Sequence, residues 1–210
     1  MGSLIGDVNG ESYLQFIAAG MAGYTVLNSA SFEGLYSAFT RMHVQRTWES
    51  ILNTPMTLDD VIFGEWLWAA LKGLFAGTAV LLVISIFQLA VYPTALLVIP
   101  CMVVACLAFS GMALAFNSIA PGYEFFSFYF SLFIAPMMIL SGAFFPVEAM
   151  PAPLQVVSAV LPLRYMVDLA RPLLVGEFPE SFLLPIFVLL AYALVGLWVA
   201  TVLTRRRLLS

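Results

Sequence analysis

The feature of this sequence that most restricts its fold is a long stretch with almost no charge. Between Trp66 and Tyr123, Lys72 is the only charged residue. Such a stretch is stable in lipid or inside a bundle of membrane helices, where helix formation satisfies the backbone polar groups. Of all 210 residues, 62% are hydrophobic and 10% are charged, which excludes a water-soluble domain. We therefore expect an all-α integral membrane protein.

Uncharged runs bounded by charged residues, proline and glycine divide the chain into about five predicted transmembrane helices. These helices cover approximately residues 12–40, 62–90, 95–117, 124–145 and 182–204. The first run exceeds the roughly 20 residues that a bilayer requires, so one of its ends should project into water. No repeat or linker interrupts the sequence, and residues 1–210 are interpreted as a single transmembrane domain.

The segment 146–181 differs from the predicted spans because it contains several prolines and charged residues. Proline removes backbone hydrogen bonds that a helix in lipid needs, so this segment is not expected to span the membrane. Its remaining apolar residues favour short amphipathic or re-entrant helices on the face of the bundle, before the last span.

The distribution of basic residues predicts the orientation. The loop 41–60 contains Arg41 and Arg46 and the tail contains three arginines, whereas the segment 146–181 contains only two. Basic residues concentrate in cytoplasmic loops, so the loop 41–60 and the C-terminus are expected in the cytoplasm. Five spans then place the acidic N-terminus, with Asp7 and Glu11, outside. Because that N-terminus carries no signal sequence, the parity suggests that an earlier span is absent from this chain.

Several kinds of chemistry have no matching motif. The single lysine, Lys72, does not belong to a phosphate-binding G-x-x-x-x-G-K-[ST] loop, so ATP and Mg²⁺ are expected on a partner chain. One histidine and two cysteines in apolar surroundings predict no metal site, and no catalytic residue or bound cofactor is predicted. The net charge of -4 without a basic patch disfavours nucleic-acid binding. This chain is therefore not expected to be an enzyme.

Several motifs occur in an order that resembles a known family. They are Gln45–Glu49 (QRTWE), Thr57–Val61 (TLDDV), Gly64–Glu65, Pro136–Val147 (PMMILSGAFFPV), Leu161–Leu163 (LPL) and Asp168–Pro172 (DLARP). Together they resemble the permease subunit of type-2 ABC exporters and, within that class, the NodJ family of lipo-oligosaccharide (nodulation-factor) exporters. The SGxFFPV run is typical of the broader class, and QRTWE is more specific to the NodJ family.

This resemblance implies a six-span permease of the bacterial inner membrane that works as a homodimer with two copies of an ABC ATPase. It also implies outward transport of an amphipathic glycolipid or lipo-oligosaccharide. The chain departs from the family pattern by lacking the first span and the amphipathic helix before it. The alternatives are a permease for drugs or polysaccharides, an ion-coupled carrier, or a truncated regulatory subunit that does not transport. The carrier is disfavoured because few ionisable residues lie at membrane depth.

The loop 41–60 contains the candidate residues for coupling to an ATPase. The spacing of Trp48 and Ile51 predicts one apolar face of a surface helix. The resemblance implies that this helix docks in a cleft of the ATPase, and an interfacial helix anchored by Trp48 is the alternative. The candidates for ATPase coupling are Arg41, Gln45, Arg46, Trp48, Glu49 and Leu52.

Three charged residues at or near membrane depth form a second candidate set. Glu33 and Lys72, both expected near the cytoplasmic ends of their helices, are candidates for an intramembrane pair, and snorkelling of Lys72 to the headgroups is the favoured alternative. Glu124 is a candidate for the cytoplasmic gate. Stabilisation of that carboxylate by the dipole of its helix explains its position equally well.

The outer segment supplies the last candidates, which are Pro146, Glu148, Arg164, Asp168 and Arg171. The spacing of the last three places them on one helix face, where local ion pairing is expected. The resemblance implies that this segment forms the exit gate. Among small residues, Ala69, Gly73 and Gly77 predict close helix packing, with a dimer seam as the alternative.

Overall fold

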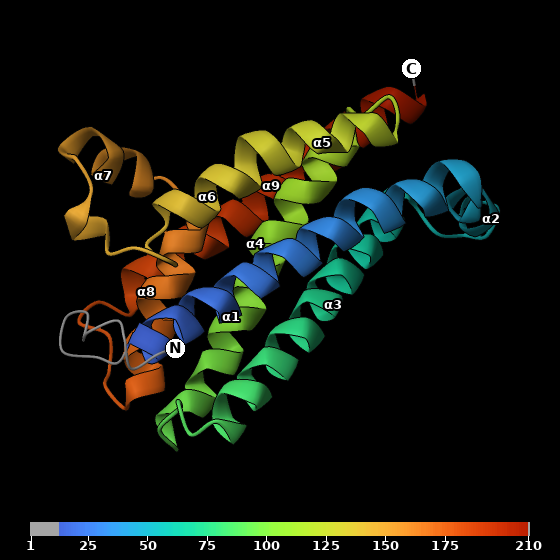
Figure 1. Cartoon of the computed structure of the whole chain (residues 1–210). Helices are drawn as coiled ribbons and strands as arrows, with labels where there is room; N and C mark the ends of the chain where they lie inside the picture. The colour runs from blue at the N-terminus through green and yellow to red at the C-terminus, as the bar shows by residue number, and fades with distance from the viewer. Residues whose placement is uncertain (1–12, 210) are drawn as a thin grey trace.

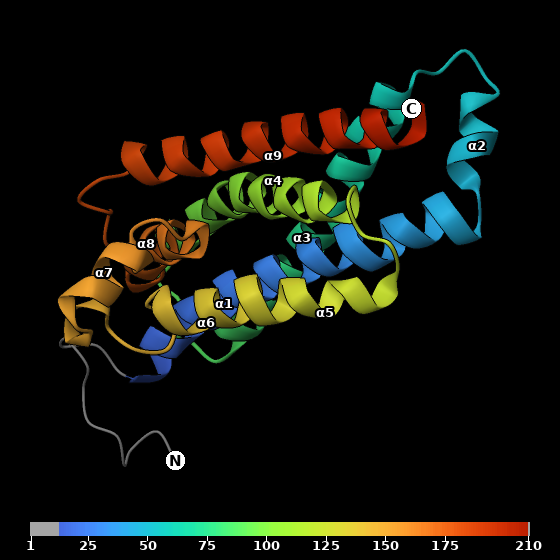
Figure 2. The ribbon, with the colours of Figure 1, turned by 90° about the horizontal axis from the view of Figure 1, so that it is seen from above.

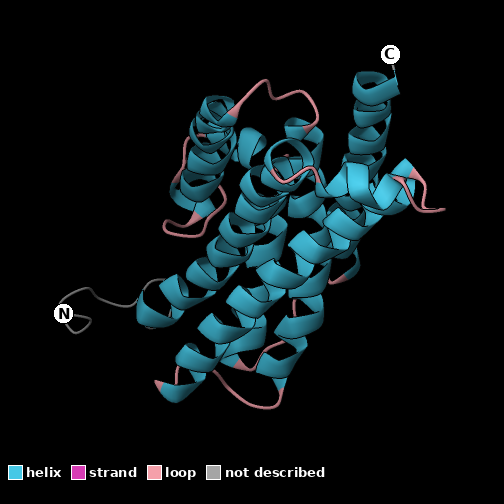
Figure 3. Ribbon diagram, turned by 90° about the vertical axis from the view of Figure 1, so that its right-hand side faces the viewer, coloured by secondary structure: helices cyan, strands magenta, loops and turns pink. Residues whose placement is uncertain are grey.

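The regular structure of this chain is entirely helical in the part that the structure describes. The structure is a computed structural model, and it describes residues 13–209. The expected all-α fold is therefore confirmed for this range (Figure 3). The acidic N-terminal residues, including Asp7 and Glu11, lie outside the described residues.

Long helices form a bundle, the short helices within residues 123–140 run along it as one broken helix, and the short helices 47–52 and 152–158 lie at its two ends (Figure 1). The α-helices are α1 (Tyr13–Phe32), α2 (Thr47–Leu52), α3 (Leu58–Ile86), α4 (Val98–Asn117), α5 (Phe126–Tyr129), α6 (Ala135–Leu140), α7 (Ala152–Ser158), α8 (Pro162–Val175) and α9 (Leu183–Leu209). Two π-helical segments, Glu33–Ser37 and Thr40–Val44, continue α1, and a third, Phe130–Ile134, joins α5 to α6.

Four described helices are long and apolar enough to cross a membrane. They are Leu58–Ile86, Thr94–Asn117, Tyr123–Leu140 and Leu183–Leu208. The remaining predicted span, 12–40, is helical from Tyr13, but α1 is not among these four helices. Its sequence includes Gln15, Thr25, Asn28 and Ser29, which lower its mean hydropathy. The second span begins at Leu58, earlier than predicted, because Thr57 and Asp60 form a capping box there.

Helix α4 lies at the centre of the bundle and contacts α1, α3, α8 and α9 (Figure 2). Its buried face is rich in alanine, cysteine and glycine, which let neighbouring backbones come close. At the crossing with α9, a Cβ atom added to Gly196 would lie 2.7 Å from the carbonyl carbon of Gly111. The bundle is thus held by close backbone packing of small residues around one central helix.

Small residues also bring α1 and α3 together. A Cβ atom added to Gly73 would lie 2.8 Å from Cβ of Ala30, and one added to Gly77 would lie 2.5 Å from the Val26 side chain. The Ala69, Gly73 and Gly77 ridge therefore packs within this chain, as its close-packing interpretation predicted. These residues are covered by the protein's own helices.

The two ends of the bundle carry different elements. At one end lie α2, the 118–122 loop and the C-terminal turns of α9, which we call the α2 end (Figure 1). There Arg205 forms an ion pair with Asp59, next to the start of α3. At the other end lie α7, α8 and the beginning of α1, which we call the α7 end. The loop 41–60 and the C-terminal arginines therefore share one end, in agreement with the arrangement that the basic residues predicted.

Candidate functional site

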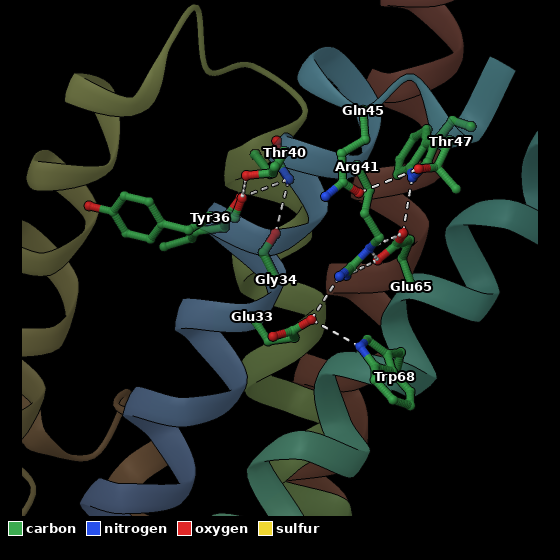
Figure 4. A network of polar contacts seen from close by, with 12 residues as sticks. Glu33, Gly34, Tyr36, Thr40, Arg41, Gln45, Thr47, Glu65 and Trp68 are labelled. Atoms are coloured by element: carbon green, nitrogen blue, oxygen red, sulfur yellow. Dashed lines mark hydrogen bonds and ion pairs between the residues drawn. The ribbon is translucent and has the colours of Figure 1, made fainter.

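A buried polar network surrounds the guanidinium of Arg41, at the α2 end of the bundle (Figure 4). Its Nη1 atom donates a hydrogen bond to Oε1 of Glu33 at 2.9 Å. Its Nε atom donates to Oε1 of Glu65 at 2.8 Å, and Nη2 also bonds that carboxylate. Arg41 thus bonds Glu33 within the continuation of α1 and joins that continuation to α3 through Glu65.

Two tryptophans complete this network. The indole Nε1 of Trp48 on α2 donates to Oε1 of Glu65 at 3.0 Å. The indole Nε1 of Trp68 on α3 donates to Oε1 of Glu33 at 2.9 Å. Arg41, Glu33, Glu65, Trp48 and Trp68 are hereafter called the Arg41 network. It connects α1, α2 and α3 in one set of contacts.

The π-helical winding of the chain after Phe32 helps to position this network. A π turn takes carbonyl groups away from the regular helical ladder, and another donor must then satisfy them. The side-chain amide of Asn117 on α4 donates to the carbonyl oxygens of Gly34 and Leu35, at 3.0 and 3.3 Å. The backbone between Glu33 and Arg41 is therefore fixed against the central helix.

Burial makes the Arg41 network a rigid connection. Glu33 and Glu65 are each 8% exposed, and Trp48 is 4% exposed. Burial lowers the pKa of Arg41, but the hydrogen bonds and charges of Glu65 and Glu33 outweigh it and raise that pKa above its usual value. The guanidinium therefore stays charged. Removing one member of a buried ion pair is strongly destabilising, because the remaining charge keeps no compensating partner.

The predicted coupling residues divide into an inward and an outward group. Arg41 and Trp48 point inward, into the network. Gln45, Arg46, Glu49 and Leu52 are exposed. Glu49 and Leu52 border a hollow of about 500 Å³ between α2 and the end of α9. In the structure, Trp48 anchors α2 to the bundle, as the alternative to ATPase docking predicted for this residue. The other face of α2 is not covered by any part of the described chain.

The expected pair between Glu33 and Lys72 is not formed in the described structure. Glu33 pairs with Arg41 instead, at 2.9 Å. Lys72 lies at the middle of α3, fourteen residues from both Leu58 and Ile86, and not near a helix end as expected. Its Nζ atom lies 5.3 Å from the centre of the Trp68 ring, one turn closer to the α2 end. That direction agrees with snorkelling of the lysine towards the headgroups.

Glu124 lies in the first turn of the Tyr123–Phe125 helix and is exposed at the α2 end. Next to it, the hydroxyl groups of Tyr123 and Thr40 lie 2.8 Å apart, which connects this turn to the end of α1. This position is compatible with both sequence-based interpretations of Glu124, the gate and the helix dipole. Its role as a gate residue stays a prediction.

The outer-segment candidates lie at the α7 end and make two kinds of contact. Arg164 and Asp168 pair on α8 at 3.5 Å. Arg171, from the same helix, donates a hydrogen bond to the carbonyl oxygen of Gly142 at 2.7 Å and lies 3.9 Å from the ring centre of Phe16. Pro146 precedes a short 3-10 helix that contains the exposed Glu148. Arg171 therefore ties the SGAFFPV loop to α1.

Sequence reasoning missed Glu65 and Trp68 as members of the site. From the sequence alone, Glu65, Trp66 and Trp68 together indicate only the interfacial start of a span, because tryptophan favours the headgroup level. The partners of Glu65 come from the end of α1 and from α2, so no helical spacing in the sequence relates them. Among residues 13–209, no group of three metal-ligating His, Cys, Asp or Glu residues occurs.

The comparison with known families identifies the class of protein. The ABC-2 type transporter family matches residues 1–175, and this chain therefore belongs to that family. Its apolar helices and its family make it a multi-pass protein of the bacterial inner membrane and a transport subunit of the ABC exporter class.

The chain is also similar in sequence to individual proteins of this kind. Nodulation protein J of Bradyrhizobium diazoefficiens is 42% identical over all of this chain and 80% of its own length. Nodulation protein J of Sinorhizobium fredii is 40% identical, again over the whole chain and 80% of its own length. The Inner membrane transport permease YadH of Escherichia coli is 29% identical over 80% of this chain and 65% of its own length. No solved structure matches the chain.

Proposed function

We propose that this chain is the permease subunit of an ABC exporter that moves a lipo-oligosaccharide or similar amphipathic glycolipid outward across the inner membrane. A separate ATPase, which binds ATP and Mg²⁺, drives this movement. The chain itself binds no cofactor. Relatives named Nodulation protein J, about 40% identical over the whole chain, support the substrate class.

The observation that carries the proposal is the attachment of α2 by the Arg41 network. The inner face of α2 is bonded through Trp48 to Glu65 of α3, and Glu65 is bonded to Arg41 at the end of α1. The outer face of the same segment presents Glu49 and Leu52 of α2 and, just before this helix, Gln45 and Arg46. An ATPase docked on this outer face would therefore displace α1 and α3 together with α2.

The proposed orientation follows from the charges at the α2 end. Arg46, Arg205, Arg206 and Arg207 lie at this end, and basic residues favour the cytoplasmic side. The ATPase and the C-terminus then lie on the same side of the membrane. Two copies of the chain and two copies of the ATPase would form the transporter, and access to the substrate would alternate at the interface between the two permeases.

The test measures docking and transport separately. Variants are the charge exchange Arg46→Glu with Glu49→Arg on α2 and, as a matched control, Glu148→Arg at the α7 end. Each permease is purified with the partner ATPase, and uptake of a fluorescent lipo-oligosaccharide is followed in inside-out vesicles. We expect the exchange to abolish ATPase capture and ATP-dependent uptake, while the control keeps both. Normal capture and uptake in the exchange variant would refute docking through α2.

If the wild-type chain captures the ATPase but transports no lipo-oligosaccharide, the proposed substrate class is refuted, whereas the proposed coupling to the ATPase is not affected. Uptake that continues without any ATPase would refute the exporter itself.

A further inference from the structure

An open trough of about 470 Å³ runs along the face of α1 that no described helix covers, beside α3. Its polar lining consists of Tyr24, Thr25, Asn28 and Ser29 from α1, Glu33 just after α1, and Lys72 from α3. These residues, except the buried Glu33, are partly or fully accessible in the described chain. They are hereafter called the α1 trough.

The depth of the α1 trough is unusual for neutral polar side chains. The Ser29 hydroxyl donates to the backbone oxygen of Lys72 at 3.4 Å, which places Ser29 level with the middle of α3. Thr25 lies one turn further from the α2 end. Lipid tails offer no hydrogen bonds, so polar groups at this depth face protein or a polar cavity.

Contacts within the chain use only part of the hydrogen-bonding capacity of the trough. The Ser29 hydroxyl donates its proton to the backbone of Lys72 but can still accept a hydrogen bond. The Asn28 amide donates to the Tyr24 hydroxyl at 3.2 Å, which uses one of its two N–H donors. Glu33, at the α2 end of the trough, is already bonded to Arg41 and Trp68. The available hydrogen-bonding groups on α1 are therefore hydroxyls and an amide, and Lys72 on α3 adds an ammonium donor. This set of groups suits a ligand that is rich in hydroxyl and amide groups.

Aromatic rings border the trough at both ends. Towards the α7 end, the rings of Tyr24 and Phe144 meet edge to face, with centres 6.4 Å apart. Towards the α2 end, Phe32 stacks on Tyr36 at 4.7 Å. Rings of this kind offer flat apolar surfaces next to polar groups, and the C–H faces of sugar rings pack on such surfaces.

We propose that the α1 trough holds the sugar headgroup of the transported substrate, with Thr25, Asn28 and Ser29 as its hydrogen-bonding residues. The inference rests on the proposed function for the presence of a glycolipid. It adds a binding site and a reason why α1 is less apolar than the other long helices. The acyl chain would remain in the surrounding lipid, so specificity would reside in the headgroup.

The first test compares Thr25→Val with Thr78→Val. Both substitutions replace a hydroxyl by a methyl group of similar size, but Thr78 on α3 bonds only to backbone oxygens of its own helix, those of Leu74 and Phe75. Full-length proteins in nanodiscs are titrated with a lipo-oligosaccharide of N-acetylated sugars that carries a fluorescent acyl chain. Phosphatidylcholine with the same chain serves as the second probe.

We expect Thr25→Val alone to weaken binding of the sugar probe, and the addition of Asn28→Leu to bring the loss to about tenfold, as for the loss of one or two hydrogen bonds. The phosphatidylcholine probe and the Thr78→Val control should be unaffected. Equal affinities of the control and the trough variants for the sugar probe would overturn the site. ATPase capture by the same variants is measured in parallel. Normal capture together with unchanged sugar binding would refute the site in the α1 trough without refuting the proposed exporter function.

The second test uses Asn28→Cys in native membranes. The natural cysteines, Cys101 and Cys106, are 1% and 0% exposed, so they contribute little background labelling. We expect a water-soluble maleimide to label Asn28→Cys, and the sugar probe to slow that labelling. Two outcomes would overturn the proposal. A disulfide between two copies through Asn28→Cys would show that protein covers this face, and no labelling of Asn28→Cys by the maleimide would show that protein or lipid covers it.

Discussion

The two ends of the bundle are stabilised by different interactions. At the α2 end, three elements meet through charged hydrogen bonds around Arg41. At the α7 end, α8 buries Leu163, Met166 and Val167 against the bundle, and Arg171 reaches a backbone carbonyl and an aromatic ring. The α2 end therefore depends on specific partners, and the α7 end depends mainly on packing. A coupling element needs a defined geometry, which directional ion pairs provide.

The largest loss of stability is expected from Glu65→Ala. This change leaves the buried guanidinium of Arg41 with Glu33 alone and leaves the Trp48 indole without its acceptor. Breaking a buried ion pair typically costs about 3–5 kcal/mol. Thermal unfolding followed by size-exclusion chromatography should show a strongly lowered melting temperature. A melting temperature equal to that of wild type would show that the α2 end does not depend on this network.

A smaller loss is expected at the α7 end from Gly20→Val. A Cβ atom on Gly20 would lie 2.0 Å from the carbonyl oxygen of Ala143, so the SGAFFPV loop must move away from α1. Overpacking of this kind typically costs about 1–3 kcal/mol. The same unfolding measurement detects the change, with Gly64→Ala as control because a Cβ atom at Gly64 meets nothing within 4 Å. Equal stability of the two variants would contradict the close contact between α1 and the loop.

Arg171→Met should have an effect comparable to that of Gly20→Val. It removes the hydrogen bond to Gly142 and the stacking on Phe16 but keeps an apolar side chain of similar length. Hydrogen bonds to charged groups contribute roughly 1.5–3 kcal/mol. We expect increased protease cleavage within 141–150 in the variant, measured by mass spectrometry of digested vesicles. An unchanged cleavage pattern would show that packing alone holds this loop.

The smallest effect on stability is expected from the exchange of Arg46 and Glu49 on α2. Both side chains are strongly exposed, 72% and 65%, and their charged atoms lie 4.0 Å apart. Exposed pairs contribute about 0–1 kcal/mol, so the melting temperature should stay close to that of wild type. Capture of the ATPase should nevertheless be lost. If the exchange lowered stability as much as Glu65→Ala, the division of α2 into an anchoring and a docking face would be wrong.

Much of the fold is predictable from this sequence, because membrane helices appear in a sequence as uncharged runs between polar residues. Proline and glycine mark the end of the span before Pro146 and the irregular segment after it. The α2 helix follows from the spacing of Trp48 and Ile51, and both side chains do pack towards the bundle. These features depend on local composition, which a single sequence contains.

The polar contacts between helices are less predictable, as Glu33 illustrates. Its choice of Arg41 rather than Lys72 depends on the rotation of α1 against α3 and on the π-helical segments between Phe32 and Gln45. Neither property follows from the spacing of residues in the sequence. Glu65 presents the same difficulty, since its partners lie on two other elements and become neighbours only in the folded bundle.

The close packing of Gly73 and Gly77 against Ala30 and Val26 has a mechanical consequence. Two helices whose backbones interlock in this way resist sliding along each other, so α1 and α3 should behave as one lever. The continuous helix from Tyr13 to Val44 gives this lever a length of roughly 45 Å at about 1.5 Å per residue. If movement of α2 tilts this lever by a small angle, the far ends of α1 and α3 would therefore move sideways by a larger distance at the opposite membrane surface. Neither helix would change its length.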